Sequence, residues 1–127
     1  MVKTPLVSLD IDDCKAVLTA LDQAKLGICV AVWAYLDYYE DWRFVLAGKH
    51  LDAVHILNGY GTINDAIRAA GITEAHKPPL LLLPLTDPLI KALRRSNGKS
   101  KQFEPRRIGG HMIGNRFVDD GYAFRIS

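Results

Sequence analysis

Four acidic side chains in two polar turns are the residues that could hold a divalent metal ion. They are Glu40, Asp41, Asp119 and Asp120. If the fold brought these carboxylates together, they could hold Mg²⁺ beside a phosphate, which is the chemistry of a metal-dependent nuclease. Paired acids beside a glycine are also what a turn requires, because short acidic side chains hydrogen-bond to their own backbone. We favour the turn interpretation and keep the nuclease as an alternative.

The remaining nucleophiles and metal ligands lack a recognisable spacing. The sequence contains no HExxH, CxxC or GxSxG motif, so a zinc protease, a redox pair and a serine hydrolase are not indicated. Cys14 and Cys29 stand at apolar positions, which predicts buried thiols. The scattered histidines predict no metal centre; they are His50, His55, His76 and His111. We expect no cofactor and no catalytic residue, and keep a small-molecule-binding protein as an alternative.

Positive charge is concentrated between Lys91 and Arg107. Seven cations and one acid give this segment a net charge of +6, against +2 for the whole chain. Cations neutralise phosphates and an aromatic ring stacks on unpaired bases, so the segment could bind nucleic acid or another polyanion. Helix ends and loops are also ordinary places for solvated cations, so this function is an alternative. The candidate residues are Lys91, Arg94, Arg95, Lys99, Lys101, Phe103, Arg106 and Arg107.

Aromatic residues gather after Gly27, in a stretch that contains both tryptophans. Trp, Tyr and Arg carry much of the binding energy at protein interfaces. Trp33 and Tyr35 should project to one side of a strand, with Trp42 across from them. We therefore favour a binding or adaptor module that acts through an aromatic sheet face, with a homodimer or another protein as the partner. The candidate residues are Trp33, Tyr35, Tyr38, Tyr39, Trp42, Arg43, Tyr122 and Arg125.

The stretch from Gly27 to Gly48 predicts the β-hairpin around which the other elements are arranged. Residues 28–36 are apolar on both faces, which is typical of an interior strand covered on two sides. Residues 42–47 alternate with a period of two, which predicts a second strand with one half-buried face. The five residues between the strands fit a hairpin loop.

Three helices are predicted outside the hairpin. Apolar residues recur at three- and four-residue spacing over 8–26 and again over 52–70, where two internal glycines weaken the helix. Asp87 as N-cap and Pro88 at the first helical position predict a third helix, which Gly98 can end.

Short strands are predicted in the second half of the chain. The leucine run 80–83 lies between prolines and is too short to span a membrane, which favours a buried strand. Residues 108–127 predict a strand, a turn at Gly114-Asn115, a second strand, a turn or bulge at 119–121 and a terminal strand.

These elements predict one α+β domain over residues 1–127. We expect two layers, with an about five-stranded mixed or antiparallel sheet and helices mainly on one face, in the order αββαβαββ. The apolar fraction of 49% and charged fraction of 24% are those of an ordinary globular protein. No secretion signal or membrane-spanning run is recognised, so a cytoplasmic location without membrane partners is expected. The sheet face left bare would be the natural surface for a partner.

The chain resembles a group of small uncharacterised bacterial proteins, some of which are encoded on mobile gene cassettes of the integron type. The stretches that carry the resemblance are Trp33-Ala34-Tyr35, Glu40-Asp41-Trp42-Arg43, Asp87-Pro88-Leu89-Ile90-Lys91-Ala92-Leu93 and Asp120-Gly121-Tyr122-Ala123-Phe124-Arg125-Ile126. Together they span most of the chain, whereas Gly59-Tyr60-Gly61 departs from the pattern. The resemblance implies a stand-alone cytoplasmic α+β domain and no particular activity.

Overall fold

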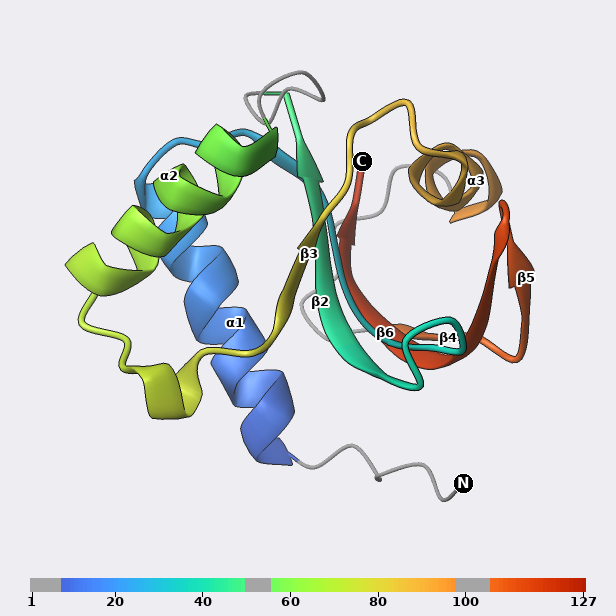
Figure 1. The fold of residues 1–127 in the computed structure, drawn as a ribbon, viewed down its shortest axis with the longest axis horizontal. Helices are drawn as coiled ribbons and strands as arrows, with labels where there is room; N and C mark the ends of the chain where they lie inside the picture. Colours follow the sequence, from blue (N-terminus) through green and yellow to red (C-terminus); the bar gives the residue numbers. More distant parts are fainter. Residues whose placement is uncertain (1–7, 50–55, 98–105) are drawn as a thin grey trace.

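The computed structural model describes residues 8–49, 56–97 and 106–127, and these form an α+β fold around one mixed sheet (Figure 1). The sheet has six strands in the order β3-β2-β1-β6-β4, and β5 pairs with β6. The elements are α1 (Ser8–Gln23), β1 (Ile28–Leu36), β2 (Asp41–Gly48), α2 (Ile56–Ala69), the 3₁₀ turn η2 (Glu74–His76), β3 (Leu80–Leu82), α3 (Pro88–Asn97), β4 (Arg106–Ile108), β5 (His111–Ile113) and β6 (Arg116–Ile126).

Strand β1 is the centre of the sheet. All nine of its residues are buried, and it runs antiparallel to β2 on one side and to β6 on the other. Ala31, Trp33 and Tyr35 point into one hydrophobic cluster, whereas Val30, Val32 and Ala34 point into a second cluster on the opposite face. The predicted hairpin and its two-sided interior strand are therefore confirmed.

The helices lie on both faces of the sheet. Helices α1 and α2 cover one face, and α3 lies on the other, where the sheet curls around it (Figure 1). Leu21 of α1 and Ile67 of α2 belong to the first cluster, and Ile90 of α3 belongs to the second. The α+β class is confirmed, with two of the three helices on one face. Because α3 covers the other, the bare sheet face expected from the sequence is wrong.

The pairing of strand β6 with β1 is interrupted at two places, opposite Ala31–Val32 and opposite Tyr35–Leu36. Leu36 pairs with Val118 and Tyr35 with Asp120, which leaves Asp119 as an extra residue in β6. Such a bulge bends a strand and increases its twist. The predicted turn or bulge at 119–121 is thus a bulge. Before it, Gly114 with a φ of 63° and Asn115 connect β5 to β6, as the sequence indicated.

The ends of α3 and α1 follow their sequence signals. The Asp87 carboxylate accepts a hydrogen bond from the Leu89 backbone N–H at 2.9 Å, which satisfies a free donor of the first turn of α3. Gly27, after α1, has a φ of 66°, a conformation that glycine adopts without strain. The predicted helix start at Asp52 and helix end at Gly98 lie outside the described residues.

Candidate functional site

The three aromatic residues expected on a sheet surface are part of the core. Trp33 and Trp42 stack with ring centroids 5.5 Å apart, and Tyr35 meets Trp42 edge to face. They do share a face, as predicted, but Trp33, Tyr35 and Trp42 are only 5%, 7% and 6% exposed. The prediction that they form a binding surface is therefore wrong. Their face of the sheet is the one that α1 and α2 cover.

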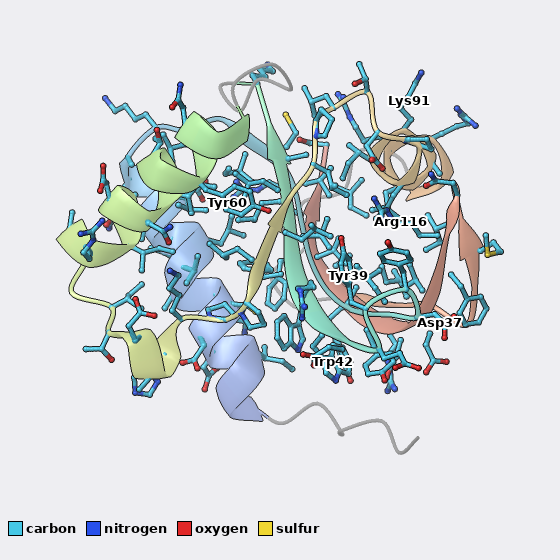
Figure 2. The ribbon with its side chains drawn as sticks, in the orientation of Figure 1. Asp37, Tyr39, Trp42, Tyr60, Lys91 and Arg116 are labelled. Atoms are coloured by element: carbon cyan, nitrogen blue, oxygen red, sulfur yellow. The ribbon has the colours of Figure 1, made fainter. Side chains whose placement is uncertain are left out.

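The tyrosines of the β1–β2 turn lie elsewhere. Figure 2 shows Tyr39 on the side of β2 opposite Trp42, where it packs against the second cluster. The Arg43 guanidinium lies 5.0 Å from the centre of the Tyr39 ring. Tyr38 meets Tyr39 edge to face at 5.1 Å and is 79% exposed. The predicted aromatic set is thus divided between two faces, and Tyr38 is its exposed member.

Two arginines of the predicted sites are held by carboxylates. Arg125 donates two hydrogen bonds to Asp22 of α1, at 2.7 and 2.8 Å. Arg107 donates two hydrogen bonds to Asp120, at 2.9 and 2.8 Å, and lies over the Tyr122 ring. Hydrogen bonding to the carboxylate raises the pKa of each guanidinium. These contacts fasten β6 to α1 and to β4, so they serve the fold.

A hollow lies beside the exposed Tyr38. Its volume is about 450 Å³. The backbone N–H of Asp37 donates to the carbonyl of Phe117 at 3.2 Å, which ties the β1–β2 turn to β6. Met112, 58% exposed, lines the same hollow. Met112 was not predicted from the sequence, where its only signal is a large apolar side chain beside a predicted turn. The lining residues are Asp37, Tyr38, Met112, Asn115, Arg116 and Phe117.

The basic segment does not form one surface. Lys91, Arg94 and Arg95 are exposed on α3, and Figure 2 shows Lys91 pointing away from the sheet. Arg107 lies on the other face of the sheet, because it shares a face with Tyr122 while its neighbour Ile108 packs into the cluster below α3. Lys99, Lys101 and Phe103 lie outside the described residues, and Arg106 is the first residue of β4.

The acidic residues come near one another without forming a metal site. Burial raises the pKa of Tyr35 above its ordinary value, and the nearby carboxylates of Glu40, Asp119 and Asp41 raise it further. The Asp120 carboxylate accepts a hydrogen bond from the Arg107 guanidinium. Across residues 8–49, 56–97 and 106–127, no group of three or more His, Cys, Asp or Glu side chains could hold a metal ion.

The histidines and cysteines add no catalytic group. His76 forms a contact of 3.1 Å with Asp13, which joins η2 to α1. His50 and His55 lie outside the described residues, and His111 is the first residue of β5. Cys14 and Cys29 are free and buried, so the prediction of buried thiols is confirmed.

A second hollow lies between α2 and the segment that leads into β3. It has a volume of about 390 Å³ and continues into a neighbouring hollow of about 220 Å³. Tyr60, at one wall, accepts a hydrogen bond from the Leu82 backbone N–H at 3.0 Å; Figure 2 shows it reaching from α2 toward β3. Asn64, Glu74 and Lys77 line both hollows. These residues were not predicted from the sequence, because they are separate polar positions without a motif.

Comparison of the chain with protein-family models, with curated proteins and with solved structures finds no match. The resemblance to proteins of integron-type cassettes therefore stays a prediction. Among the helices of the described residues, none has the length and apolar character needed to cross a membrane.

Proposed function

We propose that this protein is a small binding module that associates with a second copy of itself through the hollow beside Tyr38. The observation that carries the proposal is that Tyr38 and Met112, the large hydrophobic side chains exposed among the described residues, line the same hollow. They come from distant parts of the chain, the β1–β2 turn and β5. Exposed apolar side chains that cluster mark interaction surfaces more often than isolated ones do.

The surface is held in place before any partner arrives. The Arg43 guanidinium covers the Tyr39 ring, and Tyr39 in turn supports Tyr38. A tyrosine that is already ordered loses little side-chain entropy on binding, and a flexible methionine adapts its shape to a partner. The arrangement therefore supplies one contact residue that rests against a neighbouring ring and one adaptable contact residue.

A second copy suits this surface because its rim carries both signs of charge. Asp37 and Arg116 line the hollow together with the apolar residues, and Arg116, 21% exposed, also lies 3.8 Å from Asp87. In a two-fold dimer the same patch meets itself, so a patch with one acid and one cation can be complementary to its own copy. The hollow is small, so we expect a weak, concentration-dependent dimer.

Light scattering coupled to size exclusion, over a series of protein concentrations, tests the proposal. We expect the wild type to shift toward dimer as concentration rises and Met112→Glu to remain monomeric at the same concentrations. Ala16→Glu, on the exposed side of α1, is the matched control and should behave as the wild type. A wild type that stays monomeric at the highest attainable concentration, or a Met112→Glu variant that dimerises equally, would contradict the proposal.

Binding of a polyanion through α3 is the second candidate function. Lys91, Arg94 and Arg95 are exposed, and among the described residues no carboxylate side chain pairs with Lys91 or Arg95. Lys91 and Arg95 are four residues apart, so they lie on one side of the helix. Lys91 and Arg95 are thus available to neutralise phosphates, whereas Arg94 Nε donates a hydrogen bond to the Ser127 carbonyl oxygen at 2.7 Å.

Anisotropy of labelled single-stranded DNA and RNA at two salt concentrations tests this candidate. The double variant Lys91→Gln/Arg95→Gln should weaken binding and reduce the salt slope by about two. The control Lys25→Gln/Lys49→Gln removes the same charge from exposed positions outside α3 and should bind as the wild type. Absence of binding at low salt, or equal loss in both variants, would remove this candidate.

A further inference from the structure

We infer that the hollow between α2 and β3 is a binding site for a small carboxylic acid with an apolar body. The hollow of about 390 Å³ lies within the range of small-molecule sites, roughly 300–1,000 Å³. Its walls come from α2, from η2 and from the proline pair that precedes β3. None of its residues takes part in the Tyr38–Met112 surface, so this inference is independent of the proposed function.

Lys77 supplies the positive charge of the site. Its side chain is only 24% exposed, and its carboxylate neighbour among the described residues is Glu74, at 3.9 Å. That distance is too long for a hydrogen bond, and Glu74 itself is 91% exposed. An ammonium group has three donors, and a largely buried one normally uses them. Lys77 therefore has donors available for an anionic ligand.

Asn64 supplies a second polar side chain to the hollow. Its Oδ1 atom is buried and has no hydrogen-bond partner, and Asn64 lines the hollow together with Lys77. Unsatisfied buried polar atoms are uncommon in native proteins, so each one calls for an explanation. A carboxylate only accepts hydrogen bonds, so it cannot satisfy this oxygen; it can instead accept from the Asn64 side-chain NH₂ group while it pairs with the Lys77 ammonium.

The other walls of the hollow favour an apolar body on the ligand. Tyr60, Pro78, Pro79 and Leu80 line this part. The Tyr60 hydroxyl is engaged by the Leu82 backbone, so the ring position is fixed. A flat or short aliphatic group can lie against the ring and the prolines, while its carboxylate reaches Lys77. This combination defines the ligand class as a small amphipathic monocarboxylate.

Titration of the ¹⁵N-labelled protein with phenylacetate, followed by NMR, tests the site. We expect saturable shifts of the Asn64 side-chain amide and of residues 77–80 at ligand concentrations of about a millimolar. Phenylacetamide, which has the same shape without the charge, should bind about tenfold more weakly, because a charge-assisted hydrogen bond is lost.

Variants identify which side chain is responsible. Lys77→Met should weaken phenylacetate binding about tenfold, and Asn64→Asp should weaken it similarly by placing a second carboxylate beside the ligand. Lys91→Met removes an exposed lysine of α3 and is the matched control, which should bind as the wild type. The inference is overturned if the wild type shows no saturable shift at these residues, if phenylacetamide binds as tightly as phenylacetate, or if the folded Lys77→Met and Asn64→Asp variants both bind as the wild type does.

Discussion

Arg107 on β4 and Asp120 on β6 form a two-point ion pair across the sheet, with nitrogen–oxygen distances of 2.9 and 2.8 Å. Asp120 is the buried charged residue of the described core, at 9% exposed, and it also accepts a hydrogen bond from the Gly121 backbone N–H. A carboxylate removed from water needs such partners. The pair therefore holds the edge strand β4 onto β6 beside the bulge at Asp119.

Removing Arg107 should destabilise the protein more than removing a fully exposed arginine does. Arg107→Gln leaves the Asp120 carboxylate buried without its cation, which is unfavourable. Arg68→Gln is the control, because Arg68 and Asp65 form an ion pair whose side chains are 76% and 77% exposed, and exposed pairs contribute little. Urea denaturation of both variants measures the difference. Equal midpoints would show that the Arg107–Asp120 pair does not support the sheet.

Tyr60→Phe should lower the free energy of unfolding by about 1 kcal/mol, because the Leu82 backbone N–H loses its acceptor. The hydrogen bond in question is 3.0 Å long and partly buried. Tyr38→Phe, which removes an exposed hydroxyl, should leave stability unchanged. Urea denaturation measures both variants, and an equal effect of the two substitutions would argue against a structural role for the Tyr60 hydroxyl.

Alanine at two glycines should change stability in opposite directions. Gly114 has a φ of +63°, and a Cβ there would clash with the Pro88 carbonyl oxygen, so Gly114→Ala should cost roughly 3 kcal/mol. Gly61, inside α2, has open space around its Cα, so Gly61→Ala should stabilise by about 0.5–1 kcal/mol. Thermal unfolding of the two variants measures whether each substitution raises or lowers the stability. Destabilisation by Gly61→Ala would mean that α2 needs its glycine.

The stability of the protein should fall with rising pH above about pH 10, in part because of Tyr35. Burial first, and then the carboxylates of Glu40, Asp119 and Asp41, raise the Tyr35 pKa above its ordinary value of 10.0. A raised pKa means that the folded state binds the proton more tightly than the unfolded state. The stabilisation that protonated Tyr35 contributes is therefore complete below the ordinary tyrosine pKa. It is lost as the pH rises through the higher pKa that Tyr35 has in the folded state.

Denaturant unfolding at several alkaline pH values measures this dependence. In Tyr35→Phe the decline should be shallower than in the wild type, because the variant has no phenol at this position. The exposed Tyr38→Phe substitution serves as the control and should keep the wild-type slope. If Tyr35→Phe and the wild type lose stability in parallel, Tyr35 does not titrate as its surroundings indicate.

The Arg125–Asp22 pair should show a small, salt-sensitive coupling energy. It joins β6 to α1, with side chains 26% and 43% exposed. Partly exposed pairs typically contribute about 0.5–1 kcal/mol, and salt screens them. A double-mutant cycle with Arg125→Gln and Asp22→Asn, measured at low and high salt, gives this energy. A coupling energy of zero at low salt would assign the contact no energetic role.

Local signals in the sequence predicted much of the fold. The two-sided apolar pattern of residues 28–36, the N-cap Asp87 and the turn at Gly114-Asn115 all appear as expected. Each depends on neighbours in the chain, through pleat periodicity or backbone conformation, so the sequence carries the information directly.

The candidate surfaces were less predictable, because burial depends on residues distant in sequence. Trp33 and Trp42 have the composition of an interface, but α1 and α2 cover their face of the sheet. Met112 and Tyr38 become neighbours only when β5 and β6 fold back beside the β1–β2 turn. Lys77 and Asn64 likewise meet only in the folded chain. Periodicity shows which residues share a face but not which element covers that face.

The contact of Tyr60 with Leu82 also bears on how the protein behaves at high concentration. β3 is an outer strand of three residues, and such strands expose backbone groups that invite pairing with another molecule. Here the Leu82 N–H is already occupied by the Tyr60 hydroxyl, and Pro78 and Pro79 have no N–H to offer. The Leu82 N–H is thereby unavailable to another molecule, so loss of the Tyr60 hydroxyl would free one donor for edge-to-edge pairing as well as remove one hydrogen bond.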